Sequence, residues 1–254
     1  MYTDSHIHID ELFKVCRGFD DQNSNIMPNK DLAFCSSSNT KEGFNFTRRF
    51  CKEYNLDRAF FSFGIHPQNP DKKNLVFLEK LCVEKKLTAI GEIGFDLFTE
   101  DFRKTLHLQK AVWSEQVWLA VKHGLPIIVH SRKAMPVFFE NIDTLKRVPA
   151  VIFHGWSGSI LEARSFLKKG VNAFFSIGKN LLRKQKRAIA MVTDFELTRL
   201  LTETDAPFMT LKNEQFTKSA DIRAVVRSFA DYRQMDGNVL AQNIADNFFK
   251  AFSV

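Results

Sequence analysis

Histidines and acidic residues recur in this sequence directly after short apolar runs. The first run ends in Asp4-Ser5-His6-Ile7-His8. Side chains two positions apart on a strand point to the same side and lie roughly 6.5–7 Å apart along it, so both imidazoles can reach one ion. Counted over all the runs, six residues of this kind stand out: His6, His8, Glu92, His130, His154 and Asp205. Imidazole and carboxylate groups together form the donor set of a transition-metal site.

Each of these residues has a simpler explanation when it is taken alone. A His-x-His pair is common on strands, Glu92 could cap a helix, and His130 could be a buried core histidine. Asp205 precedes Ala-Pro and could be a helix N-cap with proline near the helix start. We favour the metal site because all six residues fall at the same end of five different strands. His107 and His123 fall inside a helical stretch, and we assign them no function.

Basic residues follow the same runs. Arg132 comes two residues after His130 and could hold a phosphate or carboxylate with two hydrogen bonds, or form a surface salt bridge. A basic group after the seventh run could line the active-site mouth or belong to a solvated helix: Lys179, Arg183, Lys184, Lys186 and Arg187. The formal net charge of +7 favours polyanionic partners such as nucleic acid.

Eight apolar runs of strand length alternate with stretches of helical spacing. The runs cover Tyr2–Ile9, Asp31–Ser36, Ala59–His66, Thr88–Gly94, Pro126–Ser131, Ala150–Gly155, Val171–Gly178 and Leu200–Asp205. The helical stretches cover Lys41–Tyr54, Leu75–Lys86, Phe102–His123, Lys133–Leu145, Ser159–Lys169, Lys184–Met191, Ala220–Phe229 and Leu240–Phe252. Continuous apolar strands suit a parallel sheet covered by helices. Eight repeats predict a closed (β/α)8 (TIM) barrel of the α/β class, in which the carboxyl ends of the strands gather at the active-site face.

The competing arrangement is a doubly wound open sheet. It would place a glycine-rich phosphate loop after the first strand, whereas the chain after Ile9 reads Asp-Glu-Leu-Phe-Lys. We find no repeat and no linker, so residues 1–254 are predicted to form a single domain. The segment Phe208–Lys218 lacks periodicity and is expected to cross the barrel mouth as a loop. Three polar residues before the fifth run are interpreted as a solvated helix face or as support for the site: Gln109, Glu115 and Gln116.

The cysteines and the hydropathy bear on the cellular compartment. The four cysteines, at positions 16, 35, 51 and 82, match no zinc or disulfide spacing and are expected to be free thiols in a reducing compartment. The sequence shows no signal peptide and no apolar run of transmembrane length. We therefore expect a cytoplasmic monomer without membrane contact.

The ordered motifs resemble those of the TatD family, which belongs to the wider amidohydrolase superfamily of metal-dependent barrels. They are Asp-Ser-His-Ile-His-Ile-Asp, Gly-Ile-His-Pro, Gly-Glu-Ile-Gly-Phe-Asp, Pro-Ile-Ile-Val-His-Ser-Arg, Phe-His-Gly-Trp-Ser-Gly-Ser and Thr-Glu-Thr-Asp-Ala-Pro. The likeness runs from Tyr2 to about Pro207. It departs from the family pattern at Gly155 and Trp156, where cysteine and phenylalanine are commoner, and at Gln215, where an Asn-Glu-Pro run would have proline.

The resemblance implies a site with two divalent metal ions. One ion would be held by His6, His8, Glu92 and Asp205, and Glu92 would bridge to a second ion held by His130 and His154. Three further residues would face the substrate phosphate or its surroundings: His66, Asp96 and Arg132. Known members are mostly metal-dependent deoxyribonucleases. Several act as 3′-to-5′ exonucleases on single-stranded DNA, and relatives deacylate mischarged tRNA.

We therefore predict metal-dependent hydrolysis of phosphodiester bonds in DNA by a dinuclear metal-activated water. Asp205 would accept the proton, and Glu92, His66 and Arg132 would complete the catalytic set. The alternative is hydrolysis of an amide, ester, lactone or aminoacyl-tRNA by the same ions, which are Zn, Mn, Mg, Ni, Co or Fe. A third hypothesis is a nucleic-acid-binding protein with a vestigial metal site. It would show a missing ligand, and all six positions are filled.

Overall fold

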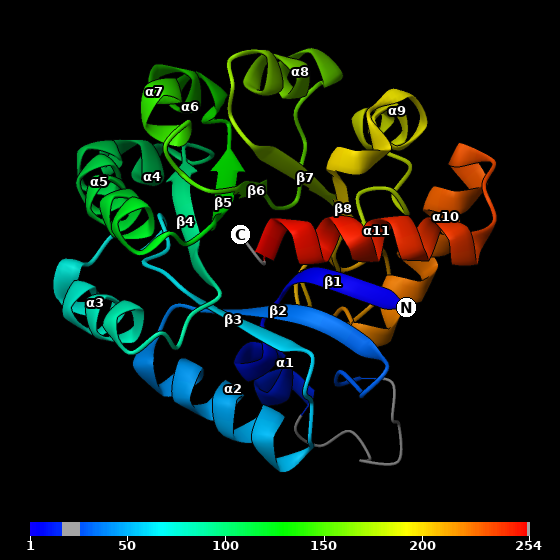
Figure 1. Ribbon diagram of the computed structural model, residues 1–254, viewed down its shortest axis with the longest axis horizontal. Helices are drawn as coiled ribbons and strands as arrows, with labels where there is room; N and C mark the ends of the chain where they lie inside the picture. The colour runs from blue at the N-terminus through cyan, green and yellow to red at the C-terminus, as the bar shows by residue number, and fades with distance from the viewer. Residues whose placement is uncertain (17–25, 253–254) are drawn as a thin grey trace.

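The computed structural model describes residues 1–16 and 26–252, and it shows eight parallel strands in chain order (Figure 1). Each strand is hydrogen-bonded to the next one in the sequence. The strands are β1 (Tyr2–Ile7), β2 (Leu32–Ser38), β3 (Ala59–Phe63), β4 (Ala89–Asp96), β5 (Ile127–Arg132), β6 (Val151–Phe153), β7 (Ala173–Ile177) and β8 (Leu200–Thr202). This order is that of a barrel in which every strand lies beside its sequence neighbour.

Hydrogen bonds between the chain at β8 and the chain at β1 bring the two edges of the sheet together. The Thr202 hydroxyl donates to the Thr3 carbonyl at 2.9 Å. The Asp205 amide donates to the His6 carbonyl at 2.9 Å, and the His8 amide donates to the Ala206 carbonyl at 2.8 Å. The sheet therefore curls into a (β/α)8 barrel, which confirms the predicted fold class and excludes the open sheet.

Helices surround the strands (Figure 1). They are α1 (Ile9–Cys16), α2 (Lys41–Glu53), α3 (Leu75–Val83), α4 (Glu100–Lys104), α5 (Leu106–His123), α6 (Met135–Glu140), α7 (Ile142–Leu145), α8 (Ile160–Lys168), α9 (Lys186–Asp194), α10 (Ile222–Arg233) and α11 (Gly237–Phe252), with 3-10 turns η1 (Lys72–Asn74), η2 (Leu197–Arg199) and η3 (Ser219–Asp221). Local signals set their ends. Thr40 caps α2 by accepting from the Gly43 amide, and Ser159 and Glu162 form a capping box on α8.

Several predicted boundaries are wrong. The strands end at Phe63, Phe153 and Thr202, and the polar residues that follow them lie in loops. The first residues of these loops still bond to the neighbouring strand, as the Gly64 amide does to the Ser38 carbonyl at 3.2 Å. Ile9, predicted to end the first strand, begins α1 instead. Two of the helical predictions, Phe102–His123 and Lys133–Leu145, are each divided into two helices, as α4 with α5 and α6 with α7.

An apolar layer fills the half of the barrel that lies away from the carboxyl ends of the strands. It is formed by inward-facing residues of the strands, among them Ala33, Cys35, Ile128, Ile152, Phe174 and Leu201, all completely buried. Phe248, Ala251 and Phe252 of α11 pack against this layer, and Figure 1 shows α11 crossing the ring of strands. The interior is thus a packed core, and α11 closes the end opposite to the site. Within the described ranges, no helix combines the length and apolar character needed to cross a membrane.

Candidate metal centre

The structure brings the six predicted metal ligands together at the carboxyl ends of the strands. His6 lies in β1, Glu92 in β4 and His130 in β5. The other three lie in the loops that follow β1, β6 and β8: His8, His154 and Asp205. Five of the six line a cavity of about 600 Å³, and His6 is completely buried beneath it. A cavity at this end of the barrel is where an active site is expected.

Glu92 is the centre of the cluster, and its two carboxylate oxygens face different pairs of histidines. Oε1 lies 2.6 Å from His130 Nδ1 and 2.6 Å from His154 Nε2. Oε2 lies 3.4 Å from His6 Nε2 and 3.7 Å from His8 Nε2. A carboxylate that divides its oxygens between two groups of donors has the geometry of a bridging ligand.

Asp205 faces the same pair of histidines as Oε2 of Glu92. Its Oδ1 lies 3.4 Å from His8 Nε2 and 3.6 Å from His6 Nε2. The backbone of Asp205 has a φ of 56°, and the carbonyl accepts a 2.7 Å hydrogen bond from the Phe208 amide. Asp205 is therefore part of a tight turn, and the alternative that it is a helix N-cap is wrong.

Two further observations support a metal site. Three sets of three residues each hold their ligand atoms within 4.8 Å of one another: His6, His8 and Glu92; His6, His154 and Asp205; His66, Glu92 and His130. His6 Nε2 is buried and has no hydrogen-bond partner among the described residues. A buried nitrogen of this kind is costly unless it binds a ligand. The third set contains His66, which the sequence predicted to face the substrate.

A second layer of polar groups fixes the histidine rings. Ser37 serves two of them, because its hydroxyl lies 3.1 Å from His6 Nδ1 and its carbonyl lies 3.1 Å from His8 Nδ1. Such partners orient the rings so that Nε2 points at the metal position. Sequence analysis missed Ser37, although the polar Ser-Ser-Ser end of an otherwise apolar run was visible.

Glu203 is a second residue that sequence analysis missed. Its side chain is completely buried, and Oε1 accepts a 2.6 Å hydrogen bond from the Gly155 amide and lies 3.8 Å from His154 Nδ1. This carboxylate therefore fixes the loop that carries His154. The available signal was its position two residues before Asp205, which places a second acidic side chain at the same strand end.

Charge neutralisation within the cluster decides the protonation of its carboxylates. Burial alone would raise the pKa of Glu92, but the surrounding histidines, His154 foremost, outweigh it and hold this pKa well below its usual range. Burial also raises the pKa of Asp205, but the neighbouring histidines outweigh it and the pKa is lowered. The hydrogen bond with His8 is the main cause of this lowering. Both carboxylates are thus ionised at neutral pH, which is the form that binds a cation.

The residues expected beside the substrate occupy the rim and its support. Arg132 lines the cavity, and its guanidinium lies 3.5 Å from Asp96 Oδ2 and 4.2 Å from the centre of the Phe98 ring. Asp96 is completely buried, and its Oδ2 also lies 3.1 Å from His130 Nε2. Asp96 therefore lies behind the rim of the cavity, where it orients His130 and Arg132.

Two glutamines of α5 support the site through its backbone. Gln116 accepts from the Ile65 amide at 2.6 Å and donates to the Ile65 carbonyl at 3.2 Å. Gln109 makes the same pair of bonds to the backbone of Asp96, at 2.9 and 3.1 Å. Both side chains are buried, so Gln109 and Gln116 support the site, as one of the two interpretations had it. Glu115 is exposed and belongs to the solvated face of the helix.

One member of the basic group differs from the prediction. Lys179 is completely buried and forms ion pairs with Glu214 and Asp221, the latter at 2.8 Å, and it also donates to the Thr217 hydroxyl. It therefore anchors the loop across the mouth instead of lining it. Arg183 does line the cavity, and the remaining three residues are exposed: Lys184, Lys186 and Arg187.

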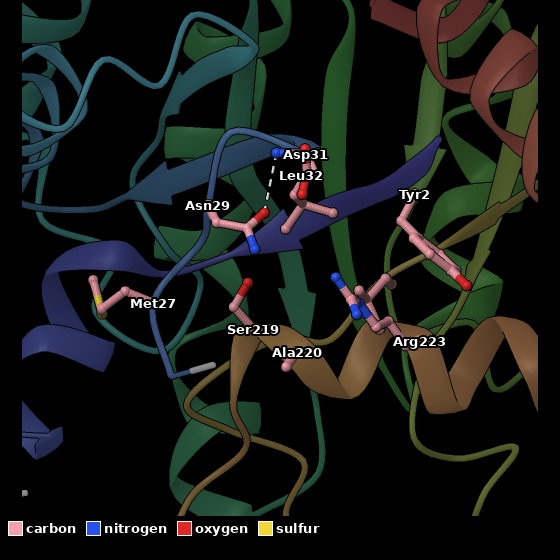
Figure 2. A pocket seen from close by; sticks show the side chains of 9 residues that line it. Tyr2, Met27, Asn29, Asp31, Leu32, Ser219, Ala220 and Arg223 are labelled. Carbon is pink, nitrogen blue, oxygen red and sulfur yellow. Dashed lines mark hydrogen bonds between the residues drawn. The ribbon is translucent and has the colours of Figure 1, made fainter. Parts of the chain in front are cut away.

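A smaller pocket lies at the opposite end of the barrel. Figure 2 shows it between the starts of β1 and β2 and the chain at η3 and α10, with the Asp31 amide bonded to Asn29 Oδ1 at 3.0 Å. Its volume is about 30 Å³, which is room for about one water molecule. The candidate active site is the cavity above Glu92, because it holds the cluster of histidines and carboxylates at the carboxyl ends of the strands.

A (β/α)8 barrel whose strand ends gather histidines and carboxylates in one cavity has the architecture of a metal-dependent hydrolase. Comparison with known families agrees. The chain belongs to the family of TatD-related DNases, whose sequence model matches residues 3–253. The predicted family is thereby confirmed.

Individual relatives support the same class. The metal-dependent hydrolase YjjV of Escherichia coli K12 is 29% identical over 222 residues, which cover 84% of each protein. The crystal structure of YjjV has a TM-score of 0.82 at 25% identity and covers 100% of this chain and 98% of that one. The 3′-5′ ssDNA/RNA exonuclease TatD of Musicola paradisiaca is 29% identical over 204 residues, or 74% of this chain and 75% of the relative. This chain is a metal-dependent hydrolase of the TatD family.

Proposed function

We propose that the protein hydrolyses phosphodiester bonds of single-stranded DNA and removes nucleotides from the 3′ end. The observation that carries this proposal is the division of the Glu92 oxygens between two histidine pairs, because this geometry suits two ions placed side by side. The name of the Musicola relative and the net charge of +7 favour a nucleic-acid substrate.

The ligands divide between the two ions as follows. His6, His8 and Asp205 would hold one ion, His130 and His154 would hold the other, and Glu92 would bridge them. When bound, the ions supply Lewis acidity and lower the pKa of water toward neutrality. The donor set of imidazoles and carboxylates suits Zn, Mn, Fe, Co or Ni, and phosphoryl transfer also commonly uses Mg.

Asp205 is the residue placed to take a proton from the attacking water. Its Oδ1 faces the cavity beside His8, and its lowered pKa keeps it ionised at neutral pH. An ionised carboxylate within reach of the attacking water can accept its proton as the water oxygen bonds to phosphorus and the bond from phosphorus to the sugar 3′ oxygen of the preceding nucleotide breaks. The leaving oxygen then takes up a proton, so the products are a shortened strand with a 3′ hydroxyl and a nucleotide with a 5′ phosphate.

His66 and Arg132 are placed to bind the phosphate. Burial lowers the pKa of His66, so its ring is neutral at pH 7. The Gln68 amide donates to Nδ1 of this ring at 3.2 Å, which leaves the proton on Nε2. His66 Nε2 lies 3.3 Å from Glu92 Oε1, so its proton would pass from this hydrogen bond to one with a bound phosphate. The Arg132 guanidinium can also donate hydrogen bonds to the phosphate oxygens as negative charge develops on them.

The first experiment compares wild-type protein with Asp205→Asn on 5′-labelled single-stranded DNA, with and without Mg or Mn. We expect a metal-dependent ladder whose rate falls on the order of a thousandfold or more in the variant, because the proton acceptor is removed. Circular dichroism should show an unchanged fold. Asp143→Asn, at a carboxylate that is 96% exposed on α7, is the matched control.

Two outcomes would contradict the proposal. Activity close to that of wild type in Asp205→Asn would remove this residue from the role of proton acceptor. No cleavage by wild-type protein that carries metal by elemental analysis would reject the nuclease assignment. A carbonyl substrate, such as an amide, a lactone or an acylated tRNA, would then be the next hypothesis for the same site.

A further inference from the structure

The rim of the cavity carries an aromatic side chain that the catalytic scheme does not use. The chain has 26 phenylalanines, and among those in the described ranges only Phe98 and Phe208 expose nearly half of their surface, at 46% and 49%. An exposed phenylalanine loses the free energy that its burial would provide, about 1.5–3 kcal/mol. Placed beside polar residues at a functional cavity, such a ring indicates a binding surface.

Phe208 lies next to the candidate metal centre. It lines the same cavity as Glu92 and Asp205, and its ring centre lies 5.2 Å from that of His8 in an edge-on arrangement. It follows Asp205 by three residues. A nucleotide whose base stacks on Phe208 would therefore have its phosphate close to Glu92 and Asp205.

The backbone holds Phe208 in a fixed position. Its amide donates to the Asp205 carbonyl at 2.7 Å, and the Thr217 amide donates to the Pro207 carbonyl at 3.0 Å. The loop that begins at Phe208 is further anchored by the ion pair between Lys179 and Glu214. A surface that is already in place avoids the entropy cost of ordering it when a ligand binds.

Positive charge lies beside this ring. Arg183 lines the same cavity and donates to the Thr210 carbonyl, two residues after Phe208. Arg132 lines the cavity as well. Aromatic rings combined with a positively charged groove are the means by which proteins bind single-stranded nucleic acid, because every base has a face that can stack.

We propose that Phe208 stacks on the base of the 3′-terminal nucleotide and thereby selects single-stranded ends as substrates. In a duplex the terminal base is paired and stacked on its neighbour, so seating it on Phe208 requires that these contacts be broken. The inference rests on the proposed nuclease function and adds a specificity-determining residue to it.

The test uses two 5′-labelled oligonucleotides that differ only in the 3′-terminal nucleotide, which is either normal or abasic. For wild-type holoenzyme we expect kcat/KM to be about tenfold higher on the normal end, because a stacked base contributes about that factor. Phe208→Leu should remove this preference through KM, and Phe208→Trp should keep it. Trp118→Leu, at an aromatic residue that is 53% exposed on α5, is the matched control.

A spectroscopic measurement separates stacking from a structural role. A 3′-terminal 2-aminopurine should lose fluorescence on binding to Asp205→Asn, and it should not when Phe208→Leu is added to that variant. The inference is overturned if wild type cleaves both ends equally, or if Phe208→Leu retains the preference or the quenching. If wild-type holoenzyme cleaves neither oligonucleotide, the proposed function fails and the inference fails with it.

Discussion

At the scale of single residues, Arg132 shows how the site combines charge with position. Its guanidinium is held between the Asp96 carboxylate and the Phe98 ring, at 3.5 and 4.2 Å, while 43% of the side chain stays exposed. A cation on an aromatic face keeps its orientation without losing all of its water. The planar group can then form two parallel hydrogen bonds with a phosphate.

Replacement of Arg132 by methionine should therefore weaken substrate binding and leave metal binding intact. Hydrogen bonds to charged groups contribute about 1.5–3 kcal/mol, so we expect kcat/KM to fall about 10- to 100-fold. Arg132→Lys should recover only part of this loss, because an ammonium keeps the positive charge but cannot form the two parallel hydrogen bonds. Initial rates and elemental analysis measure the two properties. Lys133→Met is the control, since Lys133 contacts the same Phe98 ring at 4.7 Å; an equal loss there would contradict the role of Arg132.

The convergence of the six candidate ligands could be predicted from the sequence, while their role in binding metal stays a prediction. Strand ends are local features of the sequence, and the barrel topology brings all of them to one face. The positions of Ser37 and Glu203 could not be predicted in the same way. Their contacts with His6 and His154 join different strands. These contacts depend on the stagger between strands, and a continuous apolar run lacks the alternation of apolar and polar residues that would specify it.

At the scale of elements, the loop across the barrel mouth depends on Lys179. The sequence indicated a loop at Phe208–Lys218 because periodicity was absent there, but a lysine after a strand is normally a surface residue. Only the structure shows that Lys179 forms ion pairs with Glu214, within this loop, and with Asp221, just after it. A buried cation with two carboxylate partners fixes the position of both segments, although its net contribution to stability is smaller than its contacts suggest.

Lys179→Met should destabilise the protein, because it leaves two carboxylates without their cation. Breaking a buried pair costs about 3–5 kcal/mol. Glu214 and Asp221 are 31% and 26% exposed and regain some water, so we expect a loss near the lower end, about 3 kcal/mol. Urea unfolding measures the loss, and the exposed Lys184→Met is the control. An unchanged unfolding midpoint in Lys179→Met would mean that the ion pairs do not hold the loop.

At the scale of the whole molecule, the two ends of the barrel have separate tasks. The carboxyl ends of the strands carry the polar cluster, and the opposite end is closed by α11 on an apolar layer. The alternation of strands and helices predicted the barrel, and it predicted a helix at Leu240–Phe252. The position of that helix across the barrel end could not be predicted, because an apolar face does not specify which surface it covers.

This division predicts that stability and activity can be changed independently. Phe248 of α11 is completely buried and packs on Phe60 with ring centres 5.1 Å apart, so Phe248→Ala should cost about 3–5 kcal/mol by leaving a cavity. Because the site lies at the other end, the rate per folded molecule should remain that of wild type at low temperature. Urea unfolding and active-site titration measure the two quantities, and Val239→Ala, at a 53% exposed position of the same helix, is the control. A loss of activity in fully folded Phe248→Ala would show that the packing below Glu92 also sets the geometry of the site.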